Sequence, residues 1–257
     1  MVKPVLLIRG DDNAGDAQAL SRLGIASLVD PYLEITMASD PTSGRELLKK
    51  LEGVASPLWL IATSVNALKF WAQIVGEEQL RAVIAARVDM QFAAVGLATA
   101  DALRAFGASQ VILPSDATGK ALAEELIGAF PVGHAIVPGG NLAMQTLPSI
   151  LLSAGWEVST AVVYTTSPVA KEPDSARLVR QKEVSAILLR SPSAVRALTH
   201  FLPNPGVPLV CAGTTTAQAL EAQGLKADAL SPKPSADVVA STIYSLLCQE
   251  RISRKKR

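Results

Sequence analysis

The strongest constraint on the fold is a regular alternation of short apolar runs with longer segments of helical periodicity. The runs are rich in Val, Leu, Ile and Ala, and most precede a stretch whose apolar residues recur at helical spacing. This alternation is typical of β-α units around a parallel sheet, whose strands are buried on both faces. The sequence therefore predicts an α/β fold. Strands are expected at residues 5–8, 58–62, 92–95, 110–113, 135–137, 186–189 and 209–212.

Helix starts are marked by small polar residues. Ser64, Ser193 and Ser235 each precede a segment of helical periodicity and are expected N-caps. The expected helices cover residues 14–23, 42–51, 65–75, 77–86, 99–106, 117–129, 143–153, 194–201, 215–223 and 236–248.

The chain also repeats itself, which indicates two similar domains. Residues 93–107 and 210–224 both read as a strand, a glycine, a Thr-Ala pair and a helix that ends at a second glycine. Residues 61–67 resemble 189–195, and residues 5–25 resemble 135–156. Two arrangements fit this order: a simple tandem split near Tyr164, or a division in which both chain ends share one domain.

Composition limits the size of the cores and the class of partner. The 257 residues are 49% hydrophobic, enough for one large or two small cores. The C-terminal residues 251–257 carry five positive charges, which leaves residues 1–250 with a net charge of −4. This negative net charge of residues 1–250 argues against a nucleic-acid-binding protein. The tail is expected to be flexible and solubilising, although it could also touch acidic surfaces.

Cysteines and histidines give no metal-site spacing. Cys211 lies in an apolar run and is expected to be a buried strand thiol, while Cys248, His134 and His200 are isolated. We expect no metal. No apolar run is long enough to cross a bilayer, and the N-terminus lacks a cleavable signal pattern. These features favour a cytoplasmic protein that binds no membrane.

Small-residue turns after the expected strands carry a family resemblance. In order, the chain has Arg9 after the first strand, Thr63-Ser64-x-Asn66-Ala67, Val95-Gly96-x-x-Thr99-Ala100, Gly155 before a strand leading to Tyr164, Ser191-Pro192-Ser193, Gly213-x-Thr215-Thr216-Ala217 and Pro234-Ser235-Ala236-Asp237. This ordered set resembles the uroporphyrinogen-III synthase family over nearly the whole chain, to about residue 247.

The resemblance implies a fold of two Rossmann-like parallel-sheet domains joined by a two-stranded connector. One domain is then discontinuous, with residues 1–35 plus 168–257. Residues 40–163 form the other domain, and residues 36–39 and 164–167 form the connector. The active site is expected in the cleft between the domains.

The resemblance also implies the reaction. Hydroxymethylbilane is cyclised to uroporphyrinogen III with loss of water and inversion of the final pyrrole, in haem and sirohaem biosynthesis. This is a hydro-lyase activity without a cofactor. The implied partners are the linear tetrapyrrole and a hand-over from hydroxymethylbilane synthase, with the chain acting as a monomer.

The sequence departs from the family at three places. Gly10 and Thr214 stand where proline is frequent, and residues 139–144 lack a basic residue often found there. These departures bear on one carboxylate contact and not on the fold.

The candidate site residues are mostly small, which suits an anionic ligand with eight carboxylates. Ligands of α/β domains sit beyond the carboxyl ends of strands, where helix N-termini offer N–H groups and a positive dipole end. Arg9 and Arg190 are candidates for bidentate carboxylate binding, with a surface ion pair as the alternative. Capping is the alternative for the hydroxyls, and a positive-φ turn for the glycines. The predicted substrate-binding residues are Arg9, Thr63, Ser64, Asn66, Gly96, Thr99, Ser191, Ser193, Gly213, Thr215 and Thr216.

Tyr164 is the candidate catalytic residue. A tyrosine phenol is protonated at neutral pH and could donate a proton to the departing hydroxyl. The alternative is a packing role between the domains. The substrate supplies most of the reactivity, so the enzyme is expected to act mainly by orientation.

Two other functions compete with this interpretation. A nicotinamide-dependent oxidoreductase would need G-x-G-x-x-G after a strand, and neither Gly10 nor Gly139-Gly140 supplies it. A two-domain ligand-binding or regulatory paralogue without synthase activity is the remaining alternative.

Overall fold

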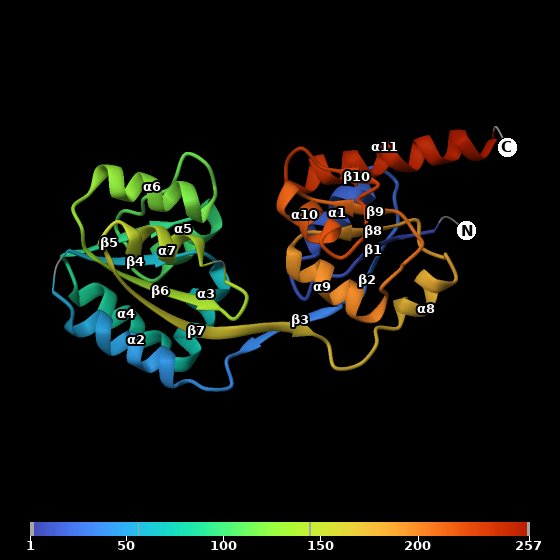
Figure 1. Ribbon diagram of the computed structural model, residues 1–257. Coiled ribbons are helices and arrows are strands. Elements are labelled where there is room, and N and C mark those ends of the chain that lie inside the picture. Colours follow the sequence, from blue (N-terminus) through green and yellow to red (C-terminus); the bar gives the residue numbers. More distant parts are fainter. Residues whose placement is uncertain (1–2, 56, 144, 256–257) are drawn as a thin grey trace. The chain divides into compact units, whose positions relative to one another are not determined.

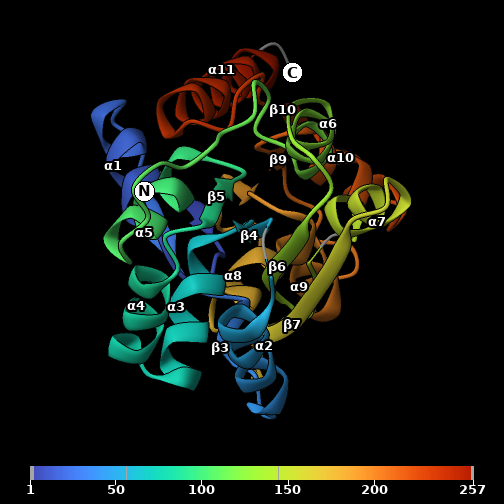
Figure 2. The same cartoon turned by 90° about the vertical axis from the view of Figure 1, so that its left-hand side faces the viewer.

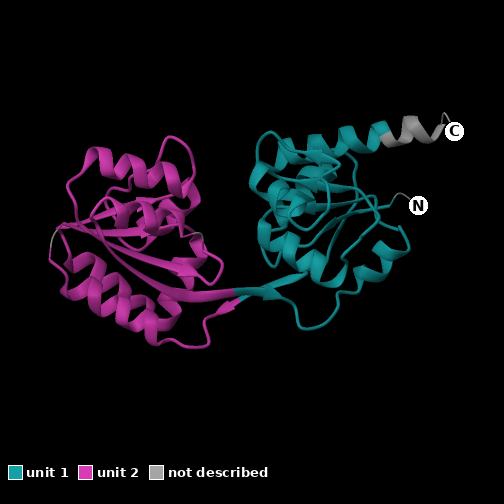
Figure 3. Ribbon diagram, in the orientation of Figure 1, with its two compact units in different colours: residues 1–35, 166–257 teal, residues 36–165 magenta. Residues whose placement is uncertain are grey.

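The computed structural model describes residues 3–55, 57–143 and 145–255, and side chains as far as Gln249. The chain forms two compact units (Figure 3). Unit 1 contains Met1–Ile35 and Thr166–Arg257, and unit 2 contains Thr36–Thr165. Both ends of the chain therefore belong to unit 1.

Unit 1 is built on a parallel sheet with the order β10-β9-β8-β1-β2. Its side chains alternate between two apolar layers, as expected for strands buried on both faces. Helices α1 and α11 cover one face, and α8, α9 and α10 cover the other. The elements are β1 (Val5–Leu7), α1 (Ala14–Arg22), β2 (Ser27–Val29), α8 (Ser175–Arg180), β8 (Ala186–Leu189), α9 (Pro192–Phe201), β9 (Leu209–Cys211), α10 (Thr214–Glu221), β10 (Ala229–Leu230) and α11 (Ala236–Lys255).

The sheet of unit 2 has the order β3-β7-β6-β4-β5, in which β7, β6, β4 and β5 are parallel. The first residues of β3 and the last residues of β7 belong to unit 1. Figure 1 shows α2 and α4 on one side of this sheet and α6 on the other, and Figure 2 shows β6 and β7 between α3 and α7. The elements are β3 (Leu33–Met37), α2 (Thr42–Gly53), β4 (Leu58–Ala62), α3 (Val65–Val75), α4 (Glu77–Ala86), β5 (Met90–Ala94), α5 (Leu97–Ala105), α6 (Gly119–Ala129), β6 (His134–Gly140), α7 (Thr146–Ser153) and β7 (Glu157–Pro168).

Both sheets are doubly wound, and each has one point where the winding reverses. In unit 1 the chain moves outward from β1 to β2 and later returns to β8 on the other side of β1. In unit 2 it moves from β4 to β5 and returns to β6 on the other side of β4. Ligands of open α/β sheets bind at such switch points, outside the carboxyl ends of the strands. The topology thus singles out the β1/β8 edge and the β4/β6 edge.

The predicted α/β class with two parallel sheets is confirmed, but several elements differ. Residues 110–113 form no strand, and only an isolated bridge joins Ile112 to Ala93. Helix α9 begins at Pro192 with Ser191 as its N-cap, so Ser193 is not the cap. Proline suits the first helical turn because it has no backbone N–H, and an N–H at this position would have no partner within the helix. Helix α11 continues to Lys255, beyond the end at residue 248 that the periodicity predicts.

Candidate functional site

The structure places the candidate residues of both units at the carboxyl ends of strands. In unit 2, Thr63 and Ser64 follow β4, Gly96 follows β5, and Tyr164 lies in β7. Asn66 and Thr99 are in the first turns of α3 and α5. In unit 1, Arg9 follows β1, Ser191 and Ser193 follow β8, and Gly213, Thr215 and Thr216 follow β9.

Tyr164 is brought beside Ser64 by an irregularity in the β6–β7 pairing. Gly139 pairs with Val162, but Gly140 pairs with Tyr164, so the register shifts by one residue. The phenol oxygen lies 3.4 Å from the Ser64 Oγ, and the half-buried ring stacks on Phe70. The ring centroids are 5.8 Å apart and the planes differ by 27°. Bulges of this kind re-aim side chains.

Ser64 also forms the start of helix α3. Its Oγ accepts a hydrogen bond from the Ala67 N–H at 3.1 Å, as an N-cap does. The phenol of Tyr164 therefore lies near the positive end of the α3 dipole. A hydroxyl at this place can donate a hydrogen bond to a ligand oxygen. The capping alternative for Ser64 is confirmed, and its substrate-binding role stays a prediction.

A small cavity adjoins these groups at the β4/β6 switch point. Its volume is about 60 Å³, and Thr63, Gly139 and Gly140 contribute to its wall. Pockets that enclose drug-sized ligands measure ~300–1,000 Å³, so this cavity can accept only one group of a larger ligand.

Gly96 and Gly213 begin helices α5 and α10 in extended conformations. Their φ values are −150° and −173°, so the expectation of a positive-φ turn is wrong at both positions. A Cβ at either glycine would meet no atom within 4 Å. Neither the backbone nor the packing of the described residues requires glycine there. Close approach of a ligand is the expectation that is left.

The threonines of these two turns differ in accessibility. Thr99 and Thr216 are only 7% and 3% exposed. Thr215 is exposed. Sequence motifs cannot separate these cases, because the helical phase decides which hydroxyl reaches the surface.

Arg9 is paired with its own neighbours. Its guanidinium lies 3.9 Å from the Asp11 carboxylate and 3.5 Å from the Asp12 carboxylate. It also donates to the Asp12 carbonyl at 3.3 Å. The Arg9 side chain remains 31% exposed, so a ligand carboxylate could exchange with these weak pairs.

Arg190 has a structural environment. Its Nε donates to Asp16 Oδ2 at 2.7 Å, and further bonds reach Asp16 Oδ1 and the Pro234 carbonyl. The two side chains are only 13% and 5% exposed. The guanidinium is thus occupied by a buried carboxylate, and the expectation of a ligand-binding Arg190 is replaced by a buried ion pair.

Ser191 and Ser193 form a local pair. Their hydroxyls are 2.8 Å apart, and Ser191 Oγ accepts from the Ala194 N–H at 3.3 Å. Both side chains are half-buried. As at Ser64, a capping serine marks the strand-to-helix turn at the switch point.

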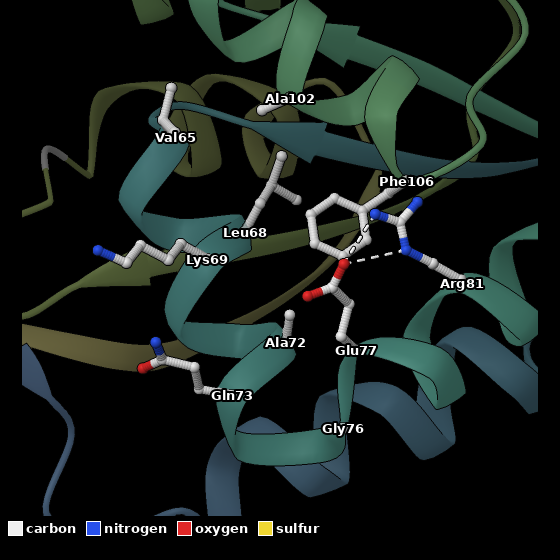
Figure 4. A pocket seen from close by; sticks show the side chains of 10 residues that line it. All are labelled: Val65, Leu68, Lys69, Ala72, Gln73, Gly76, Glu77, Arg81, Ala102 and Phe106. Carbon is white, nitrogen blue, oxygen red and sulfur yellow. Dashed lines mark hydrogen bonds and ion pairs between the residues drawn. The ribbon is translucent and has the colours of Figure 1, made fainter.

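A larger hollow lies on the flank of α3, α4 and α5 (Figure 4). It measures about 580 Å³ and contains none of the predicted site residues. Arg81 is held there by an ion pair with Glu77 at 2.8 Å and stands over the Phe106 ring at 4.8 Å. Its charge is already satisfied within the protein.

Two general features bear on cofactors and membranes. Across the described residues, no group of three or more His, Cys, Asp or Glu could hold a metal ion. Among the helices of the described chain, none combines the length and apolar character needed to span a bilayer.

Comparison with known proteins gives consistent matches. A family model described as uroporphyrinogen-III synthase HemD matches residues 16–240. A uroporphyrinogen-III synthase of Chlorobaculum parvum is 25% identical over 241 residues, covering 88% of this chain and 92% of that protein. A mutant uroporphyrinogen III synthase of Thermus thermophilus superposes with a TM-score of 0.64 at 19% identity, covering 95% and 99% of the two chains. The synthetase of Helicobacter pylori gives a TM-score of 0.62 at 18% identity, with the same coverage. These two structures show a shared fold.

Proposed function

The chain belongs to the uroporphyrinogen-III synthase family, and from that premise we propose how its residues carry out the reaction. The protein is a lyase that cyclises hydroxymethylbilane in tetrapyrrole biosynthesis. We propose that Tyr164 donates a proton to the departing hydroxyl and that small polar groups hold the carboxylates. This proposal rests on the position of the Tyr164 phenol oxygen. It lies within hydrogen-bond distance of Ser64 Oγ, at the N-terminus of α3.

The first chemical step is the loss of water. The Tyr164 O–H bond breaks as its proton passes to the leaving hydroxyl, the C–O bond breaks, and the pyrrole nitrogen, which keeps its proton, supplies electrons to form an azafulvenium cation. The positive end of α3 stabilises the phenolate that remains. A well-placed general acid contributes typically ~10²–10⁴-fold to the rate.

The later steps need orientation more than further acids or bases. The substituted carbon of the final pyrrole attacks the exocyclic carbon of the azafulvenium cation, and a spiro intermediate forms. This intermediate fragments and recloses with that ring inverted, and the proton lost on rearomatisation can return to the phenolate. The balance is one substrate to one macrocycle and one water. Holding the reacting atoms together can supply much of such a rate enhancement.

Carboxylate binding is assigned to residues at the carboxyl ends of the strands, at the switch points and after β5 and β9. Arg9 offers a guanidinium, while Thr63, Asn66, Ser193 and Thr215 offer donors from exposed or half-buried side chains. The turns at Gly96 and Gly213 leave space for a carboxylate to approach the helix N-termini. Ser64 and Ser191 contribute as helix caps, whereas Thr99 and Thr216 are buried in the first turns of α5 and α10.

Replacement of Tyr164 by Phe tests the proton-donor role. Because only the hydroxyl is removed, the fold should persist, and kcat should fall by ~10²-fold or more. The remaining product should still be isomer III, since orientation is independent of the acid. Single-turnover rates and the isomer ratio measure both effects. Unchanged turnover would refute the proton-donor role, and a change to isomer I would assign Tyr164 to orientation instead.

Three narrower expectations stay predictions. We infer a cytoplasmic location from the sequence, and a monomeric state and hand-over of hydroxymethylbilane from its synthase from the family resemblance. The lability of the substrate, which closes spontaneously to the uninverted isomer, favours such a hand-over.

A further inference from the structure

Two residues outside the family motifs, Gly140 and Phe70, contact the Tyr164 ring. We propose that they are positioning residues that hold the phenol at the N-terminus of α3. This inference rests on the proposed function of Tyr164. Neither residue touches the reacting atoms, so both would act through the tyrosine alone.

The absence of a side chain at Gly140 is required by the tyrosine. A Cβ at this position would lie 2.5 Å from two ring carbons of Tyr164 and 2.9 Å from its hydroxyl oxygen. Gly140 is not among the glycines with positive φ, so backbone conformation does not explain it. The ring rests directly on the backbone of β6.

The backbone of Tyr164 is fixed at the same place. After the register shift, Tyr164 pairs with Gly140, and the Asn141 N–H donates to the Tyr164 carbonyl at 3.1 Å. The base of the side chain is therefore anchored where the ring needs the space that glycine leaves. An extra residue in β7 aims the phenol, and Gly140 accommodates it.

Phe70 limits the ring through a second element. It lies in α3, is only 8% exposed, and stacks on the Tyr164 ring. Ser64 starts the same helix, so one rigid element carries both the ring contact and the partner of the hydroxyl. The phenol is thereby placed relative to the helix end and not merely packed.

The chemistry of the contact predicts how Gly140→Ala would act. The atoms that a new methyl group would meet are the far end of a side chain with two rotatable bonds. The ring should swing aside while both strands keep their positions, which displaces the hydroxyl from Ser64. We expect kcat to fall by ~10-fold or more, towards the value of Tyr164→Phe, with KM changed less and isomer III retained.

A double-mutant cycle separates positioning from other roles. In the Tyr164→Phe background there is no proton to misplace, so adding Gly140→Ala should lower kcat less than twofold. Phe70→Leu should behave in the same way with a smaller loss. The matched control is Gly128→Ala in α6, where a Cβ meets nothing within 4 Å. If the losses multiply in the double variant, or if Gly140→Ala keeps full kcat, the proposal fails.

A spectroscopic measurement tests the placement without relying on activity. The chain has three tyrosines, so ¹⁹F NMR after incorporation of 3-fluorotyrosine gives few signals, and Tyr164→Phe identifies one of them. Gly140→Ala and Phe70→Leu should move that signal, whereas Gly128→Ala should not. An unchanged signal in Gly140→Ala would contradict the placement of the Tyr164 ring against Gly140. Full activity of Tyr164→Phe would overturn the proton-donor role and, with it, the positioning function.

Discussion

At the scale of single residues, Arg9 faces competition from its own loop. Asp11 and Asp12 place two negative charges beside the guanidinium that is proposed to bind a substrate carboxylate. Exposed ion pairs of this kind contribute roughly 0–1 kcal/mol, so a substrate carboxylate can displace them. The acidic neighbours would then weaken substrate binding by competition and by repulsion.

Asp12→Asn tests this competition. Asp12 has a φ of 50°, a left-handed conformation that asparagine tolerates well, so the loop should keep its shape. We expect KM to decrease by ~2–5-fold at low salt, with the difference shrinking as salt screens the charges. Arg9→Gln should raise KM. The matched control is Asp237→Asn, which removes the exposed partner of Arg22 elsewhere in unit 1. An unchanged or higher KM for Asp12→Asn would contradict the account.

Cys211 gives a prediction about pH and reactivity. Burial in β9 raises the pKa of its thiol to about 11, and the side chain is fully enclosed. Because a thiolate is the reactive form, this thiol should stay protonated and inert at neutral pH. Ellman's reagent should therefore titrate about one of the two cysteines in the native protein and both after unfolding. Rapid reaction of both in the native state would contradict this burial.

At the scale of elements, the Arg190–Asp16 pair joins three parts of unit 1. Asp16 lies in α1, Arg190 follows β8, and the Pro234 carbonyl precedes α11. Removing one partner of a buried ion pair leaves an uncompensated charge and typically costs ~3–5 kcal/mol.

Asp16→Ala should therefore lower the free energy of unfolding of the protein by ~3–5 kcal/mol. Replacing both partners by apolar residues, Asp16→Leu with Arg190→Met, should cost much less because no charge stays buried. The control is Arg22→Ala, which breaks an exposed pair between α1 and α11 and should cost no more than ~1 kcal/mol. Urea denaturation gives all three values. Equal losses for Asp16→Ala and Arg22→Ala would show that burial of the pair is unimportant.

The elements also show what the sequence could and could not predict. Apolar periodicity located most strands and helices because both sheets are buried on two faces. It failed at residues 110–113, where an apolar run only bridges the edge strand β5 at Ala93. It could not anticipate the bulge at Gly139/Gly140, since a register shift depends on partner strands that are distant in sequence. The Arg190–Asp16 pair was missed for the same reason, because 174 positions separate its members.

At the scale of the whole molecule, the sequence repeats acquire a structural meaning. The strand before each Gly-x-x-Thr-type turn is β5 in unit 2 and β9 in unit 1, and each lies next to the strand of the preceding repeat, β4 or β8. The third repeated pair supplies β1 to unit 1 and β6 to unit 2. Unit 1 therefore combines one repeat from the first half of the chain with two from the second half, and unit 2 combines two from the first half with one from the second. The Gly139-Gly140 pair could not be assigned a positioning role from the sequence, because that role depends on contact with Tyr164 of the neighbouring strand β7.

The central claim is that this chain closes hydroxymethylbilane to the inverted ring by orientation and one proton donor. The most direct test incubates the purified, chelator-treated protein with freshly prepared hydroxymethylbilane, without added cofactor, and separates the oxidised products by isomer. A parallel reaction without protein gives the spontaneous rate of formation of isomer I. Isomer III should dominate and form faster than the spontaneous product. Formation of isomer I alone, at the rate seen without protein, would contradict the central claim.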